Sequence, residues 1–231
     1  MKFWAVVPAA GIGARFGGTV PKQYALLNGT AIAAVTLQRL LAVDSELSIM
    51  VALHPADSWF AEAVPANPRI STCVGGRRRA DSVLAALEAI EGEDDDWVLV
   101  HDVARPCVTV ADIRKLLSEL RNDPAGGLLA VAVSDTLKQV AEGIVTHTVD
   151  RDQVWAAVTP QMFRYGALRA ALQNNDGVTD EASAMEKAGV CPRVVEGRRD
   201  NIKITCREDL AIAEAILRYQ ADEPKPAGAQ A

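Results

Sequence analysis

Short apolar, β-rich runs alternate with helical patterns along most of the chain, and this alternation limits the possible folds more than any other feature of the sequence. The apolar runs span residues 3–7, 47–53, 70–74, 97–100, 128–133 and 202–205. Apolar residues recur near a helical period over residues 31–42, 80–90, 110–120, 165–172, 179–188 and 208–219. Strands that alternate with helices form a mostly parallel sheet with helices on both faces. The pattern therefore predicts one α/β domain over residues 1–219, followed by a disordered tail over 220–231.

Length and charge narrow the class of protein further. A chain of 231 residues is near the upper limit of what one hydrophobic core organises. The net charge of −6 argues against a surface that follows nucleic-acid phosphates, whereas a small anion needs only a local positive pocket. No stretch approaches the ~18 apolar residues of a membrane span. We therefore expect a cytoplasmic protein that binds neither nucleic acid nor membranes, with the acidic run at residues 91–96 as a solvated loop.

One segment, residues 134–152, breaks the alternation of strands and helices. Two runs of polar and β-branched residues, 136–140 and 144–149, flank a three-residue turn in which Gly143 suits a positive φ. The composition predicts a β-hairpin arm that is too polar for the core and projects from the domain. Because an isolated hairpin is marginally stable, we expect the arm to pack against a second copy of the chain in a homodimer.

A loop of small residues, 8–18, follows the first predicted strand. In parallel sheets ligands bind at the carboxyl ends of the strands, and backbone amides of such a loop can hold a phosphate chain. Arg15 and Lys22 are close enough along the chain to flank one triphosphate. The loop matches neither the dinucleotide fingerprint, because Phe16 replaces the third glycine, nor the P-loop, because Pro21 precedes Lys22. This excludes a dehydrogenase.

Other polar residues follow later strands. Asp102 and Arg105 come after the run at 97–100, where an aspartate can hold Mg²⁺ and an arginine can hold a phosphate or base. His101, beside them, is more typical of a side chain that satisfies backbone groups. A pair of glycines precedes Ser82, which either binds a base or sugar or caps a helix.

The second half of the chain carries four more candidates, each with a structural alternative. Arg151 can bind an anion or form a surface ion pair, and Thr179 can bind a substrate or cap a helix. Lys203 can bind a phosphate or lie in solvent on an edge strand. Thr159 follows an apolar run at residues 155–158.

Taken in order, the motifs resemble those of the 2-C-methyl-D-erythritol 4-phosphate cytidylyltransferase family. The matching segments, over residues 2–218, are PAAGIGARF, PKQY, GGRRRADSV, HDVARP, DTLK, TVDR, TPQ, TDEASA and DNIKIT. The resemblance implies a Rossmann-like nucleotidyltransferase domain that transfers CMP from CTP to the polyol phosphate, with Mg²⁺, in isoprenoid precursor synthesis. The attacking phosphate is already an anion, so the reaction needs cations and amide dipoles rather than a general base.

The resemblance also implies roles for single residues. Arg15 and Lys22 correspond to the stabilisers of the transition state. Asp102 is predicted to bind Mg²⁺ because of its position after a strand. The nucleotide pocket falls on Pro8, Ala9, Ala10, Gly11, Gly13, Gly76, Asp81, Ser82, Asp102 and Arg105. The second-substrate side falls on Thr136, Arg151, Thr159, Thr179 and Lys203. Arg151 and Lys203 correspond to residues that position the attacking phosphate. In the family the arm is swapped across a homodimer, which implies that Thr136, Arg151 and Thr159 serve the neighbour's site.

Two positions depart from the family pattern. The family usually has an acid where Arg77 stands and often alanine where Val103 stands, so neither residue enters the predicted site.

Two other functions share part of this sequence pattern. Ribitol 5-phosphate cytidylyltransferases share the glycine loop and the PKQ, HDxxRP, TPQ and NIK elements, but TVDR with Trp155, and TDEASA, favour the erythritol enzyme. A catalytically silent nucleotide-binding protein is the second alternative. The chain argues against it by retaining five charged residues, Arg15, Lys22, Asp102, Arg151 and Lys203.

Overall fold

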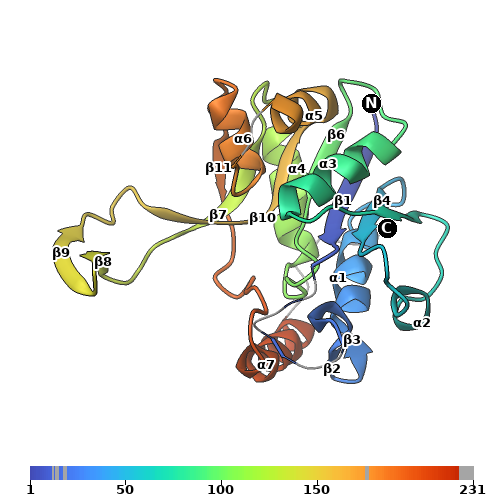
Figure 1. The fold of residues 1–231 in the computed structure, drawn as a ribbon, viewed down its shortest axis with the longest axis horizontal. Helices are drawn as coiled ribbons and strands as arrows, with labels where there is room; N and C mark the ends of the chain where they lie inside the picture. The colour runs from blue at the N-terminus through green and yellow to red at the C-terminus, as the bar shows by residue number, and fades with distance from the viewer. Residues whose placement is uncertain (12, 14–15, 18–19, 175–176, 224–231) are drawn as a thin grey trace.

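Seven strands form one mixed sheet in the order β11-β7-β10-β6-β1-β4-β5 in a computed structural model of the chain (Figure 1). The structure describes residues 1–223 apart from 12, 14, 15, 18, 19, 175 and 176. The strands are β1 (Phe3–Ala9), β4 (Ser48–Leu53), β5 (Ile70–Val74), β6 (Trp97–Val100), β7 (Gly127–Ala132), β10 (Trp155–Arg164) and β11 (Arg193–Glu196). β10 is antiparallel to β6 and β7, and the other pairs in the sheet are parallel. This confirms the predicted mostly parallel α/β fold.

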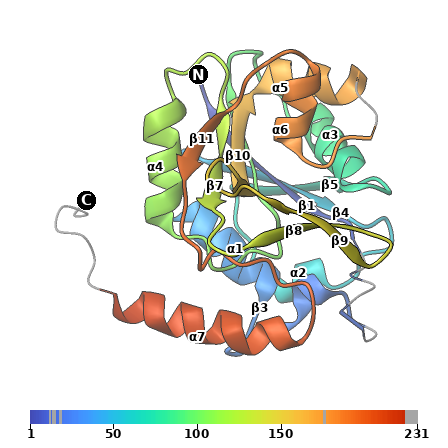
Figure 2. The same ribbon diagram turned by 90° about the vertical axis from the view of Figure 1, so that its left-hand side faces the viewer.

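Helices cover both faces of the sheet (Figure 2). They are α1 (Ile32–Leu41), α2 (Phe60–Ala63), α3 (Arg79–Ala89), α4 (Val110–Leu120), α5 (Tyr165–Asn174), α6 (Glu181–Lys187) and α7 (Glu208–Asp222). Successive residues of a strand point to opposite faces. Leu99 of β6 therefore packs in one cluster with α1 and α4, while Val98 and Val100 pack in another with α3, α5 and α6.

A third, smaller cluster joins the two ends of the chain. Ala213 of α7 is buried with Leu27 of the short strand β2 (Leu26–Leu27) and with Ile204. β2 pairs with β3 (Thr30–Ala31) just after the one-turn helix η1 (Lys22–Tyr24). This packing brings residues 201–207 beside the segment that carries Lys22.

The largest error in the predicted elements concerns residues 202–205. This segment has no regular secondary structure and is not a strand of the sheet; Ile204 donates one backbone hydrogen bond, of 2.9 Å, to the carbonyl oxygen of Ala104. β6 has no free edge for it, because β1 and β10 already pair with its two sides. We call residues 201–205 the strap. The strands β10 and β11 were not predicted.

Two smaller differences concern charged residues and the chain end. Asp96 is buried rather than solvated: its carboxylate accepts bonds from the backbone of Lys2 at 2.6 Å and of Glu93 at 3.1 Å. α7 continues to Asp222 instead of ending at residue 219, while the predicted tail beyond 223 lies outside the described residues. In the described part of the chain, no helix has the length and apolar character to cross a membrane.

The predicted hairpin arm is present, and in Figure 1 it projects to the left of the sheet. Its strands, β8 (Leu137–Ala141) and β9 (Ile144–Val149), form a separate two-stranded sheet. The turn has two residues rather than the predicted three. Glu142 and Gly143 have φ of 49° and 81°, because a turn with two positive φ angles matches the twist of the strands it joins.

Candidate active site

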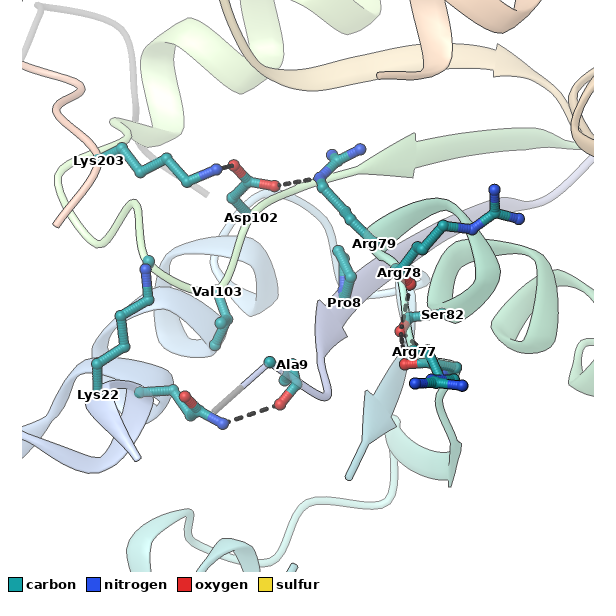
Figure 3. A pocket seen from close by; sticks show the side chains of 14 residues that line it. Pro8, Ala9, Lys22, Arg77, Arg78, Arg79, Ser82, Asp102, Val103 and Lys203 are labelled. Atoms are coloured by element: carbon teal, nitrogen blue, oxygen red, sulfur yellow. Dashed lines mark hydrogen bonds and ion pairs between the residues drawn. The ribbon is translucent and has the colours of Figure 1, made fainter. Parts of the chain in front are cut away.

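A cavity of about 160 Å³ lies at the carboxyl ends of β1 and β6 (Figure 3). These strands are neighbours, so the loops that follow them meet at one edge of the sheet. The cavity is lined by Pro8, Ala9, Gly11, Lys22, Gln23, Gly76, Arg77, Arg78, Arg79, Ser82, Asp102, Val103, Ala104 and Lys203. Predicted residues of both substrate sides thus meet in one cavity. Ala10 and Gly13 are described but do not line it, and Arg15 lies outside the described residues.

The glycine pair before α3 allows three segments to approach closely. A Cβ on Gly75 would lie 2.7 Å from the Cβ of Ala10, and one on Gly76 would overlap Asp81. The Ser82 hydroxyl accepts a bond from the Gly76 N–H at 3.1 Å. Ser82 therefore shapes the loop that lines the cavity.

Asp81, predicted to bind nucleotide, does not line the cavity. It caps α3, where its carboxylate accepts bonds from the backbone and guanidinium of Arg78, at 3.1 and 2.7 Å. These hydrogen bonds lower the pKa of Asp81. Its nearest cation is therefore within its own helix cap.

Asp102 lies between two cations. Its Oδ2 accepts from the ammonium of Lys203 and its Oδ1 from Nε of Arg79, both at 2.7 Å (Figure 3). Burial raises the pKa of Asp102, but Arg79 and Lys203 outweigh burial and hold this pKa well below its usual range. Asp102 is therefore an ionised carboxylate that orients two cations at the cavity.

The strap is held by side chains from three parts of the chain. Asn201 donates to the carbonyl oxygen of Thr159 at 2.8 Å, and Arg105 donates to that of Asn201 at 2.7 Å. Lys22 donates from Nζ to the carbonyl oxygen of Ile204 at 3.0 Å. Arg105, predicted to bind nucleotide, therefore acts in this structure by fixing the strap that presents Lys203. Gln23, which was not predicted, donates to the carbonyl oxygen of Ala9 at 2.9 Å and ties η1 to β1.

Thr159 and His101 form a buried pair beneath Asp102. The Thr159 hydroxyl accepts from the Asp102 N–H at 3.1 Å and lies 3.0 Å from Nδ1 of His101, whose Nε2 lies 3.1 Å from the Arg105 carbonyl oxygen. Burial lowers the pKa of His101 to about 4, so the ring is neutral. Nε2 must then donate to the carbonyl, and Thr159 donates to Nδ1. Thr159 therefore supports its own chain's site, unlike the predicted role in the neighbour's site, because β10 carries it back between β6 and β7.

The remaining second-substrate candidates lie away from the cavity. Thr136 and Arg151 are exposed at the base of the arm, where Arg151 donates to the carbonyl oxygen of Ser134. Thr179 is exposed and donates to the hydroxyl of Ser183 at 3.4 Å near the start of α6. Within one chain, Thr136 and Arg151 are not brought to the cavity.

The described side chains around the cavity do not fit a metal ion held by the protein alone. Both oxygens of Asp102 already accept from cations, and both oxygens of Glu181 accept from Arg79. Within the described ranges, no group of three or more His, Cys, Asp or Glu side chains is placed to hold a metal. A metal bound to Asp102 would first have to displace Lys203 or Arg79.

These features define a class of protein. A small-residue loop and two lysines at the carboxyl ends of adjacent parallel strands suit an α/β enzyme that binds the phosphates of a nucleotide. The family model for 2-C-methyl-D-erythritol 4-phosphate cytidylyltransferase matches residues 3–219. The chain therefore belongs to this family and is a nucleotidyltransferase.

Individual relatives agree with the assignment. A 2-C-methyl-D-erythritol 4-phosphate cytidylyltransferase of Ectopseudomonas mendocina (strain ymp) is 51% identical over 219 residues, which cover 91% of this chain and 93% of the relative. The crystal structure of the enzyme of that name from Francisella tularensis has a TM-score of 0.82 at 40% identity, covering 94% of this chain and all of the other. The crystal structure of a 4-diphosphocytidyl-2C-methyl-D-erythritol synthase has a TM-score of 0.84 at 32% identity, covering 94% of this chain and 98% of the other.

Proposed function

We propose that the chain transfers CMP from CTP to 2-C-methyl-D-erythritol 4-phosphate in this cavity. An oxygen of the polyol phosphate attacks the α-phosphorus of CTP, the bond to the bridging oxygen breaks, and pyrophosphate leaves. The product is 4-diphosphocytidyl-2-C-methyl-D-erythritol. The observation that carries the proposal is that Lys22 and Lys203 line one cavity together with residues that follow β1 and β6, so that two cations and small residues surround the same space.

The two lysines take different parts in this proposal. Lys22 belongs to the segment after the glycine loop and stabilises the charge that develops on the triphosphate as pyrophosphate leaves. Lys203 positions the attacking phosphate, whose negative charge competes with Asp102 for the ammonium. No side chain has to remove a proton, because the attacking oxygen is already ionised.

The base of CTP is proposed to lie by Gly76 and Ser82. This part of the cavity offers backbone groups at close range, because Gly76 has no side chain and Ser82 fixes its position. A site that hydrogen-bonds the 4-amino group of cytosine leaves polar groups unpaired with uracil, at a cost of about 1–3 kcal/mol. CTP is therefore expected to exceed UTP in kcat/KM, and equal values would contradict this placement.

A requirement for Mg²⁺ stays a prediction. Since Asp102 is occupied by cations in the chain itself, the metal is proposed to enter on the triphosphate and not on a preformed protein site. The test is a Mg²⁺ titration of activity with wild type and Asp102→Asn. An unchanged Mg²⁺ optimum supports this view, whereas a higher requirement in the variant would make Asp102 a metal ligand.

The arm is proposed to join two chains in a homodimer and to deliver Arg151 to the partner's cavity. Its outer surface supports this, because Val140, Ile144 and Val145 are 49%, 71% and 55% exposed. Apolar side chains on a hairpin that is marginal alone favour burial against another surface.

The test of the function is a product assay. Purified protein is incubated with CTP and either methylerythritol 4-phosphate or ribitol 5-phosphate, and both pyrophosphate and the nucleotide product are measured, the latter by mass spectrometry. Turnover with the first acceptor and little with the second is expected. Turnover with ribitol 5-phosphate alone, or nucleotide binding without turnover, would overturn the proposal.

A further inference from the structure

Three consecutive arginines precede or begin α3, and they have different surroundings. Arg77 is exposed, and Arg78 pairs with Asp81 at the surface. Arg79 instead turns inward. Its Nε donates to Asp102, and its two terminal nitrogens donate to the two carboxylate oxygens of Glu181 at 2.6 and 3.0 Å.

Glu181 is among the most buried charged groups of the protein. Its side chain is 1% exposed, against 26% for Arg79. Burial raises the pKa of Glu181, and Arg79 opposes this rise. Arginine suits the position because its planar fork serves two carboxylates at once, whereas a lysine ammonium acts as one compact charge. Glu181, Arg79, Asp102 and Lys203 thus form a chain of alternating charge across four segments.

The network reaches the element expected to contact the second substrate. Glu181 is the first residue of α6, directly after Thr179 and Asp180. Gln161 of β10 fixes the same helix end, donating to Asp180 at 2.9 Å and accepting from the Ala182 N–H at 2.7 Å. These bonds fix the start of α6. Because Arg79 donates to both Glu181 and Asp102, it links Asp102 to this fixed helix end.

A buried ion pair does not by itself require a functional explanation, but it often adds little to the stability of the fold. Apolar side chains of similar volume in the same place are often as stabilising, because two charges must lose their hydration. What an apolar pair cannot do is orient Asp102. An apolar replacement can therefore preserve a purely structural role, but it cannot preserve a role in positioning Asp102.

We propose that Arg79, anchored by Glu181, is a positioning residue that fixes Asp102 and thereby the ammonium of Lys203. The proposal rests on the proposed function, in which Lys203 holds the attacking phosphate. Arg79 offsets part of the negative charge of Asp102, so Lys203 can leave this carboxylate for the substrate. Without Arg79, Lys203 is the one described cation that remains within hydrogen-bond distance of the Asp102 carboxylate, since Nε of Arg105 is 3.8 Å away. The ammonium of Lys203 then stays paired with Asp102 and no longer binds the substrate phosphate.

The decisive variant is the double substitution Arg79→Met with Glu181→Leu, compared with Arg79→Lys and Glu181→Gln. Melting temperature, kcat and the KM of each substrate are measured. The double variant is expected to melt near the wild type, with kcat lowered about 10- to 100-fold. KM for methylerythritol 4-phosphate rises, while KM for CTP changes less than about twofold. Arg79→Lys is also expected to raise KM for methylerythritol 4-phosphate more than KM for CTP, because lysine cannot bridge both carboxylates.

The matched control is Arg169→Gln, which removes an arginine of α5 whose guanidinium lies 3.7 Å from Asp94, outside the cavity. It is expected to leave both KM values unchanged. A folded double variant with wild-type kcat and KM would reduce the network to a structural role and overturn the proposal. If the double variant does not fold, Glu181→Gln decides: a raised KM for the polyol phosphate supports the proposal, and unchanged kinetics overturn it. A wild-type enzyme that releases no pyrophosphate would instead overturn the proposed function.

Discussion

The cavity and the hairpin arm are built in opposite ways. Around the cavity, polar side chains satisfy one another within one chain: Asp102 has a cation on each oxygen, and the Thr159 hydroxyl bonds both to the Asp102 N–H and to His101. On the arm, β8 and β9 form a sheet of their own, and Ile144 is 71% exposed.

The difference follows from what each region costs to fold. A buried charge without a partner is strongly unfavourable, so the cavity has to be complete before substrate arrives. An isolated hairpin gains little from its own packing, and for this reason the arm is proposed to pack against a second chain. Mutations at the cavity are therefore expected to change catalysis, and mutations in the arm are expected to change the proposed dimerisation.

The largest effect is expected for Lys22→Ala. Loss of this cation should lower kcat by about 10²–10³, because its charge acts on the transition state more than on bound CTP. Steady-state kinetics with both substrates measure this. Lys115→Ala on α4, whose ammonium binds the Glu196 carbonyl oxygen at 2.8 Å, is the control. A normal kcat with weaker CTP binding would contradict the assigned role.

The second prediction tests whether the two halves meet across chains. In a two-fold dimer of Lys22→Ala and Arg151→Ala chains, one site carries both lesions and the other carries neither. Random mixing makes about half of the dimers mixed, so about a quarter of wild-type activity should return although each parent is nearly inactive. The variants are unfolded together, refolded, and checked for mixing by two affinity tags. No recovery in mixed dimers would place Arg151 in its own chain's site.

The third prediction concerns the arm alone. Ile144→Asp should weaken the proposed dimerisation on the order of tenfold, or about 1.4 kcal/mol, because a charge would replace an apolar side chain at the proposed contact surface. Analytical ultracentrifugation over a concentration series measures the dissociation constant. Thr146→Ser on the same strand is the control. Equal dissociation constants for Ile144→Asp and wild type would show that the exposed apolar side chains do not form the dimer contact.

The fourth prediction concerns His101 and applies only at acidic pH. Since burial lowers its pKa to about 4, below the ordinary value of 6.5, the unfolded chain takes up the proton first as pH falls. The stability from neutral His101 is fully present above pH 6.5 and is lost towards pH 4, by at most about 1.4 kcal/mol per pH unit. Urea unfolding at several pH values should show that the free energy of unfolding changes less steeply with pH in His101→Gln than in wild type. His147→Gln on the exposed arm is the control, and an unchanged slope for His101→Gln would contradict the prediction.

Local patterns in the sequence predicted a large part of the fold. Residues 70–74, 97–100 and 110–120 were assigned with the same bounds as β5, β6 and α4. The positive φ of Gly143 was also predicted correctly. Such features depend on periodicity or on one residue's backbone freedom, which neighbouring residues in the chain define. The placement of Lys22, Asp102 and Lys203 at one cavity followed from the rule for strand ends and from the family resemblance.

Contacts between distant residues were decided only by the tertiary structure. Arg79 and Glu181 are 102 positions apart, and Thr159 and His101 are 58 apart. Each of these side chains had an ordinary local interpretation, as part of a basic cluster, a helix start or a strand end. The strap resembled a strand because Ile202 and Ile204 alternate with polar residues, but β1 and β10 already pair with both edges of β6. The local sequence determines which side chains a segment carries. Tertiary packing determines which residues they contact, because the partners and the burial of a side chain are defined only once the whole chain has folded.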